Sequence, residues 1–134
     1  HLDLPDEARL HPVVQDLTAL ANNVVCWSND IISLEKEMRR GDVHNLVLTI
    51  RHRDRCMLQE AVYRAAAMHD AEVRRFLAIE SELPSFSPAV DADLRRYVAV
   101  LRAWMRGNLD WATDSGRYRP PAKAVLSITT LSAT

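Results

Sequence analysis

Three residues with oxygen-bearing side chains, Asn29, Ser33 and Glu37, follow one another at four-residue intervals. Because a helix turns by about 100° per residue, each four-residue step drifts by only about 40°, so in a helix these side chains share one face. An amide, a hydroxyl and a carboxylate are hard oxygen donors of the kind that Mg²⁺ accepts, with water and substrate phosphate completing the coordination. The spacing therefore predicts one half of a magnesium site.

A cationic side chain lies next to this face, because Lys36 falls within about 20° of the direction of Asn29. The triplet carries a single carboxylate against a divalent ion, so the site needs an anionic ligand such as diphosphate, to which Lys36 would add a point charge. Asp30 lies about 100° away from the triplet, which predicts a place behind the ligands or on the helix surface. Polar triplets at this spacing are also common on solvated helix faces, and spacing alone leaves that alternative open.

Helices must hold this face in place. Apolar residues recur at three- and four-residue steps from Pro12 onwards, which predicts one long helix that ends near Arg39 and Arg40, with Gly41 as the stop. Further helices are predicted over residues 45–53, 57–83 and 90–113, after a short one at 5–10. Glycine occurs only 3 times, and no stretch alternates as a strand would. The predicted fold class is all-α, with long helices and short connections.

The overall composition narrows the classes of function. Hydrophobic residues make up 48% of the chain and the formal net charge is −1, so we expect ordinary globular packing and no nucleic-acid partner. The 2 cysteines are too few and too far apart for a zinc site or a disulfide framework, which favours reduced thiols and a cytoplasmic location. No apolar run approaches the roughly 20 residues that span a bilayer, so no membrane contact is expected. The first residue is His1 rather than methionine, which favours a piece of a longer enzyme.

The order of residues around the triplet resembles that of a known family. The stretch NDIISLEKE at 29–37 resembles the second metal motif of class I terpene synthases, especially the bacterial type, including the basic residue before the glutamate. The stretches RGDVHNLV at 40–47 and WMRGNLDW at 104–111 also resemble this family, as does the arginine–tyrosine pair at 117–118. The resemblance implies that residues 1–118 form the C-terminal portion of the α-helical catalytic domain, with 119–134 as a C-terminal tail.

The resemblance implies a reaction and a metal. It implies a bacterial-type terpene cyclase that uses magnesium to ionise an isoprenyl diphosphate and then cyclises the carbocation inside a deep apolar pocket. Farnesyl diphosphate is the expected substrate, by analogy with the family. Asn29, Ser33 and Glu37 are expected to hold one Mg²⁺, with three such ions in the complete enzyme.

The same resemblance implies separate contacts for the diphosphate and for the hydrocarbon. Lys36, Arg117 and Tyr118 are expected to bind the leaving diphosphate, because a planar guanidinium holds phosphate oxygens in pairs. Trp104 is expected to line the hydrocarbon cavity, where an aromatic face stabilises a desolvated cation by about 2 kcal/mol. Trp111 lies on the same helix face and is interpreted as core packing.

Two features of the family are missing from the chain. No Asp-Asp pair occurs, so the first, aspartate-rich metal motif is not present, and the family's diphosphate-sensing arginine is missing as well. The segment alone is therefore expected not to ionise substrate. Its expected partners are the isoprenyl diphosphate and the missing N-terminal part of the catalytic domain, and a homodimer stays open.

Other interpretations stand beside the cyclase. One is a chain-elongating prenyltransferase. Those enzymes carry aspartate-rich sequences at both metal sites, so the Asn, Ser and Glu residues of this motif argue against it. A non-catalytic helical fragment or interaction module is the third interpretation. Val25 and Cys26 lie one turn before the triplet, and the sequence does not decide whether they line the cavity or pack in the core. His69 and Glu72 have the spacing found in carboxylate-bridged metal bundles, but a single copy predicts surface residues.

Overall fold

The computed structural model describes residues 3–41 and 44–114, and the side chains of these ranges as far as Asn108. The helices in these ranges are α1 (Asp6–Arg9), α2 (Pro12–Ile32), α3 (Leu34–Arg39), α4 (Leu46–Asp54), α5 (Leu58–Glu80) and α6 (Pro88–Asp114). The described residues contain no strand, which confirms the predicted all-α class. Within the same ranges, no helix combines the length and the apolar character needed to cross a membrane.

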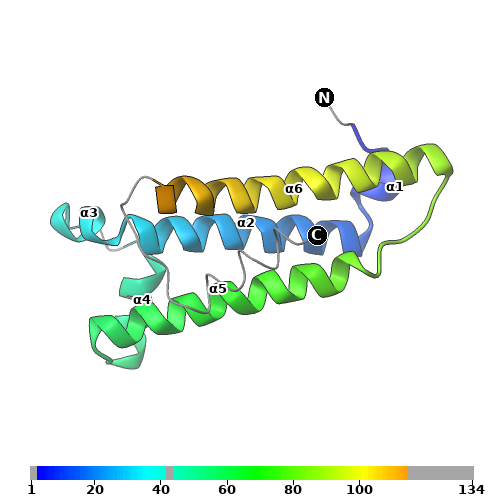
Figure 1. Ribbon diagram of the computed structural model, residues 1–134. Coiled ribbons are helices and arrows are strands. Elements are labelled where there is room, and N and C mark those ends of the chain that lie inside the picture. The colour runs from blue at the N-terminus through cyan, green and yellow to red at the C-terminus, as the bar shows by residue number, and fades with distance from the viewer. Residues whose placement is uncertain (1–2, 42–43, 115–134) are drawn as a thin grey trace.

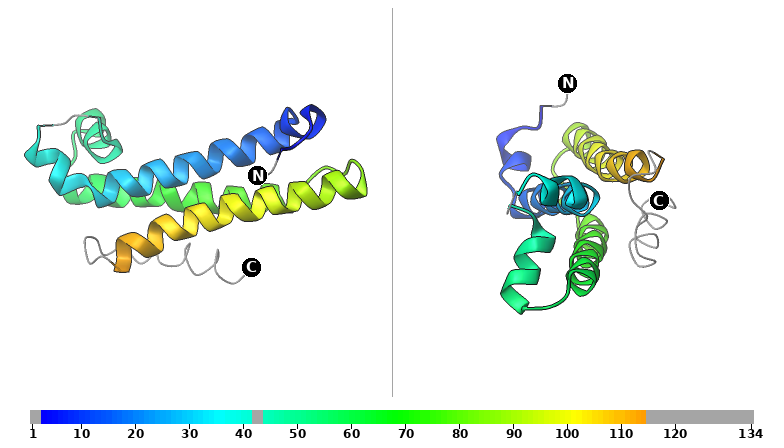
Figure 2. Two further views of the ribbon diagram at one scale, coloured as in Figure 1. Left: turned by 90° about the horizontal axis from the view of Figure 1, so that it is seen from above. Right: turned by 90° about the vertical axis from the view of Figure 1, so that its left-hand side faces the viewer.

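The three long helices lie side by side, with α2 between α5 and α6 (Figure 1). Helix α5 runs against α2, whereas α6 returns in the same direction as α2, so the C-terminal ends of α2 and α6 lie at one end of the bundle (Figure 2). The shorter α4 packs on α5 and on α2 at that end, and α3 extends beyond it. This end of the bundle carries residues 29–37.

Two apolar clusters hold the helices together. One lies between α2, α5 and α6, where Leu17, Phe76 and Leu94 are almost completely excluded from solvent. The other, which includes Ile50 and Ala61, lies where α4 and α5 meet the end of α2. Each large apolar side chain buried in this way contributes about 1.5–3 kcal/mol, so the amphipathic stripes predicted from the sequence are the surfaces that stabilise the bundle.

The prediction of one continuous first helix is wrong, because α2 gives way to α3 at Ser33. Ser33 has φ −90° and ψ 5°, and its hydroxyl donates to the Asn29 carbonyl oxygen over 2.7 Å. A continuous helix would offer the carbonyl oxygen of Asp30 to the amide of Leu34. That oxygen instead accepts a 2.7 Å hydrogen bond from the side chain of Asn45, which comes from another part of the chain. Local periodicity cannot reveal such a competing donor.

The prediction that His69 is a surface residue is also wrong. His69 is only 1% exposed and shares the inner face of α5 with buried Ala65 and Val73. Neither ring nitrogen has a hydrogen-bond partner among the described residues, and burial lowers the pKa of His69 to about 4, so the ring is neutral near pH 7. Glu72 accepts a 3.1 Å hydrogen bond from Asn23 on α2, so its carboxylate is engaged with that helix rather than with the histidine.

Candidate metal centre

The triplet lies at the junction of α2 and α3, and two of its side chains touch. Ser33 Oγ lies 2.5 Å from Glu37 Oε1, so its single hydroxyl hydrogen is shared between this carboxylate and the Asn29 carbonyl oxygen. Backbone hydrogen bonds of 2.9 Å from Ser33 N to the Asn29 carbonyl and from Glu37 N to the Ser33 carbonyl continue the helical spacing across the break. Asn29 is exposed one turn earlier on α2. The three side chains therefore share a face although the helix that carries them is interrupted.

The donor set of this face fits a hard divalent cation. A hydroxyl that donates to a carboxylate keeps its lone pairs, and both carboxylate oxygens keep lone pairs as well. Within the part of the chain that the structure describes, the Asn29 amide has no hydrogen-bond partner and Lys36, exposed on α3, forms no ion pair. No group of three or more His, Cys, Asp or Glu side chains in that part could hold a metal. A metal centre at this end of the bundle would therefore depend on amide and hydroxyl ligands.

Asn45 holds the second oxygen of the Glu37 carboxylate, and sequence reasoning missed it. Its Nδ2 donates to Glu37 Oε2 over 2.7 Å, and its Oδ1 accepts a 2.9 Å hydrogen bond from the Val47 amide at the start of α4. The residue is 2% exposed. Asparagine directly before an apolar helical stretch is a common N-cap, and that signal could have placed it ahead of the helix rather than inside it. Its contact with Glu37 has no signal in the sequence.

Asp30 lies against α4 rather than with the triplet. Its Oδ2 accepts a hydrogen bond of 3.0 Å from the backbone amide of Leu46. Burial raises the pKa of Asp30 and the nearby charge of Glu37 raises it further, while the bond from Leu46 acts in the opposite direction. Asp30 is thus half-buried against the start of α4 rather than on the open helix surface, and its place behind the ligands stays a prediction.

Helix α6 meets α2 next to the triplet. Asn108 Nδ2 donates to Ser28 Oγ over 2.7 Å, one residue before Asn29. Trp104, one turn earlier on α6, is 45% exposed rather than packed in the core, and Val100 beyond it is 55% exposed. The structure thus brings the helix that carries Trp104 to the candidate site, while the role of the indole as a cavity wall stays a prediction.

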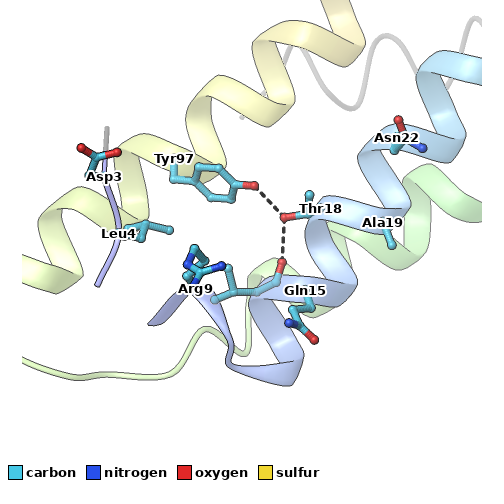
Figure 3. A pocket seen from close by; sticks show the side chains of 9 residues that line it. Asp3, Leu4, Arg9, Gln15, Thr18, Ala19, Asn22 and Tyr97 are labelled. Carbon is cyan, nitrogen blue, oxygen red and sulfur yellow. Dashed lines mark hydrogen bonds between the residues drawn. The ribbon is translucent and has the colours of Figure 1, made fainter. Parts of the chain in front are cut away.

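A hollow of about 720 Å³ lies further along α2, towards its N-terminal end (Figure 3). Tyr97 reaches across it from α6, and its hydroxyl is 2.7 Å from Thr18 Oγ1. Asn22, which also lines the hollow, is on the same face of α2 as Asn29. The sequence did not decide whether Val25 and Cys26 line the cavity or pack in the core. Val25 packs against the core cluster of α2, α5 and α6, and Cys26 is exposed.

Several residues singled out in the sequence lie beyond the described part of the chain. Arg117 and Tyr118 follow the end of α6, and the side chain of Trp111 in its last turns is not described either. Their expected roles, and the boundary expected after residue 118, stay predictions.

Comparison with known proteins identifies the family. Residues 1–75 match the model of terpene synthase family 2, C-terminal metal binding. The chain is 43% identical over 123 residues to the (+)-T-muurolol synthase ((2E,6E)-farnesyl diphosphate cyclizing) of Roseiflexus castenholzii, covering 92% of this chain and 38% of that protein. It is 44% identical over 120 residues to the 10-epi-cubebol synthase of Sorangium cellulosum, covering 90% of this chain and 38% of that protein. It is 36% identical over 115 residues to the germacrene A synthase of Nostoc punctiforme, covering 86% of this chain and 36% of that protein.

The chain thus spans less than two fifths of the length of these relatives. The match includes α2 and α3, which carry the candidate metal ligands, and α4, which supports them. Both the described helices and the matched residues agree with the resemblance noted in the sequence. The chain belongs to terpene synthase family 2, whose model is described as C-terminal metal binding, and the residues that the structure describes are all-α in class.

Proposed function

We propose that the protein carrying this chain is a magnesium-dependent sesquiterpene cyclase that acts on farnesyl diphosphate. The observation that carries the proposal is the contact of Ser33 with Glu37, with Asn29 one turn earlier, in a chain whose family is described as metal-binding. The relatives support the choice of substrate, because the (+)-T-muurolol synthase is named as cyclizing farnesyl diphosphate. These hard oxygen donors match the ligand preference of Mg²⁺.

The proposed reaction begins when the carbon–oxygen bond of the substrate breaks. The diphosphate departs with the electron pair, and an allylic carbocation remains, which cyclises and then loses a proton or captures water. Bound Mg²⁺ would supply the positive charge that stabilises the leaving diphosphate. Asn29, Ser33 and Glu37 would hold one of three such ions in the complete enzyme.

The other residues assigned from the resemblance would act on the two halves of the substrate. Lys36, exposed next to the triplet, would contact the diphosphate, as would Arg117 and Tyr118 from the segment after α6. Trp104 would present its aromatic face to the carbocation, and its side chain is 45% exposed rather than buried in the core. A cytoplasmic location and a homodimer stay predictions of the same proposal.

The test is an assay of the full-length protein with geranyl, farnesyl and geranylgeranyl diphosphates in the presence of Mg²⁺. Hydrocarbon products and released inorganic diphosphate are both measured. Farnesyl diphosphate should yield a cyclic terpene, and Glu37→Gln should abolish its formation. Glu35→Gln is the matched control, because Glu35 lies on the same short helix but is exposed and paired with Arg39.

Three results would count against the proposal. Failure of all three substrates would remove the cyclase function and favour the non-catalytic interpretation. A longer prenyl diphosphate as product would favour the chain-elongating prenyltransferase. Equal activity of Glu37→Gln and wild type would show that the triplet is not the metal site.

A further inference from the structure

We propose that Asn45 is a positioning residue that holds the Glu37 carboxylate ready for the metal ion. The inference rests on the proposed function, because it takes Glu37 as a ligand. Asn45 itself would touch neither metal nor substrate. It would act through hydrogen bonds that join the end of α2, the start of α4 and the carboxylate on α3.

The side-chain amide of Asn45 uses both of its donor hydrogens and its acceptor. Nδ2 donates to Glu37 Oε2 and to the Asp30 carbonyl oxygen, each over 2.7 Å, and Oδ1 accepts from the Val47 amide over 2.9 Å. The orientation of the amide group follows from these partners. A flipped amide would set its oxygen against two acceptors and its NH₂ against a donor. A side-chain amide, with two donor hydrogens and one acceptor oxygen, satisfies all three partners, which neither a hydroxyl nor a carboxylate does.

Among the residues that the structure describes, few other contacts hold the Glu37 side chain in place. Helix α3 has 6 residues and buries only Leu34 among its own side chains. The carboxylate is held at Oε1 by Ser33, itself a candidate ligand, and at Oε2 by Asn45. A carboxylate free to rotate would lose that freedom when it binds a cation, whereas one that is already ordered does not. Partners behind metal ligands act in this way, and their removal typically costs about 10- to 100-fold in metal affinity.

A purely structural explanation is that Asn45 only caps α4. A cap needs an acceptor for the amide of Val47, and serine or aspartate provides one as well as asparagine does. The contact with Glu37 needs a donor at the length of an asparagine side chain. Asn45→Ser therefore keeps a cap acceptor and removes the Nδ2 donors to Glu37 and to the Asp30 carbonyl oxygen, and Asn45→Asp does the same with an added negative charge beside Glu37. These two variants separate capping from positioning.

The experiment measures binding of Mn²⁺, a paramagnetic probe for the Mg²⁺ site, to the full-length protein with inorganic diphosphate present, by electron paramagnetic resonance. The unfolding temperature without metal is measured in parallel. We expect Asn45→Ser to weaken Mn²⁺ binding by about 10- to 100-fold while the protein stays folded, with an unfolding temperature lowered by the loss of the bond to the Asp30 carbonyl oxygen. Asn45→Asp should weaken binding at least as much. His11→Ala is the control, because it removes a side-chain cap from α2 at the other end of that helix and should leave Mn²⁺ affinity unchanged.

A double-variant comparison distinguishes the outcomes. In the Glu37→Gln background, Asn45→Ser should cause no further loss of Mn²⁺ affinity, because the carboxylate that it positions is gone. Unchanged affinity in the single variant, an equal loss in both backgrounds, or unfolding of both the serine and the aspartate variants would overturn the inference. If Glu37→Gln itself binds Mn²⁺ as wild type does, the proposed function fails instead.

Discussion

Asn108 on α6 donates a 2.7 Å hydrogen bond to the hydroxyl of Ser28 on α2, across 80 residues of sequence. Ser28 is 3% exposed and its hydroxyl also donates to the carbonyl of Val25 over 3.0 Å. The bond therefore joins two helices at the turn that precedes Asn29. It sets the end of α6, which carries Trp104, beside the candidate metal ligands.

Removing the hydrogen bond between Asn108 and Ser28 should weaken the packing of the end of α6 on α2. We expect Asn108→Ala to lower the free energy of unfolding of the full-length protein by about 0.5–1.5 kcal/mol, measured by urea denaturation, and to reduce turnover. Thr18→Val is the matched control, because it removes a different α2–α6 side-chain bond, which Tyr97 forms near the solvent-exposed hollow. A larger loss of stability for Thr18→Val than for Asn108→Ala would contradict this prediction.

Trp104 and its neighbour Met105 should respond differently to truncation. Met105 is fully buried, so Met105→Ala should destabilise the protein by about 2–5 kcal/mol through the cavity it leaves. Trp104 is exposed on the described surface, so Trp104→Ala should reduce turnover or change the product while the unfolding midpoint moves much less. Assays of product composition and of thermal unfolding check both variants. Equal destabilisation by the two substitutions would mean that Trp104 is a core residue.

Burial of His69 should make the fold sensitive to acid. Burial lowers the pKa of His69 from 6.5 to about 4 in the folded protein. Between these values the unfolded chain binds a proton on this ring and the folded chain does not. The contribution of His69 to the free energy of unfolding is therefore fully present above pH 6.5. It is lost progressively as the pH falls towards 4, by up to about 3 kcal/mol.

His69→Leu should flatten this pH dependence, because leucine fills the site without a titrating group. At pH 7 its stability should equal or exceed that of wild type, since the ring nitrogens of His69 have no hydrogen-bond partners among the described residues. The measurement is urea denaturation of the full-length protein at pH 7 and pH 5. His52→Leu, at an exposed position of α4, should keep the wild-type pH dependence. Undiminished acid sensitivity in His69→Leu would assign the effect to other groups.

Arg117 should matter for the reaction rather than for the fold. If its guanidinium binds the leaving diphosphate, Arg117→Ala should lower turnover by at least about tenfold without moving the unfolding midpoint. Arg119→Ala is the control, with the same change two positions along the chain. Steady-state kinetics with farnesyl diphosphate and a thermal scan check the pair. Unfolding of Arg117→Ala would show that the arginine is structural.

The sequence by itself determined the helices, the polar face and the family. The three- and four-residue recurrence of apolar residues predicted the start of α2 and both ends of α4, α5 and α6 to within a few residues, because that recurrence is the condition for a helix to bury one side. The four-residue spacing of Asn29, Ser33 and Glu37 predicted their common face, since backbone geometry alone sets the directions of those side chains.

Only the tertiary structure decided what surrounds that face. Asn45 donates to the Asp30 carbonyl oxygen at the end of α2 and to the Glu37 carboxylate because helix packing brings α4 against the end of α2, and no local pattern encodes such contacts. The same reason applies to His69, which was predicted from its charged neighbours to be exposed but lies inside the bundle. Direction along a helix is a local property, whereas burial and hydrogen-bond partners depend on which elements pack together.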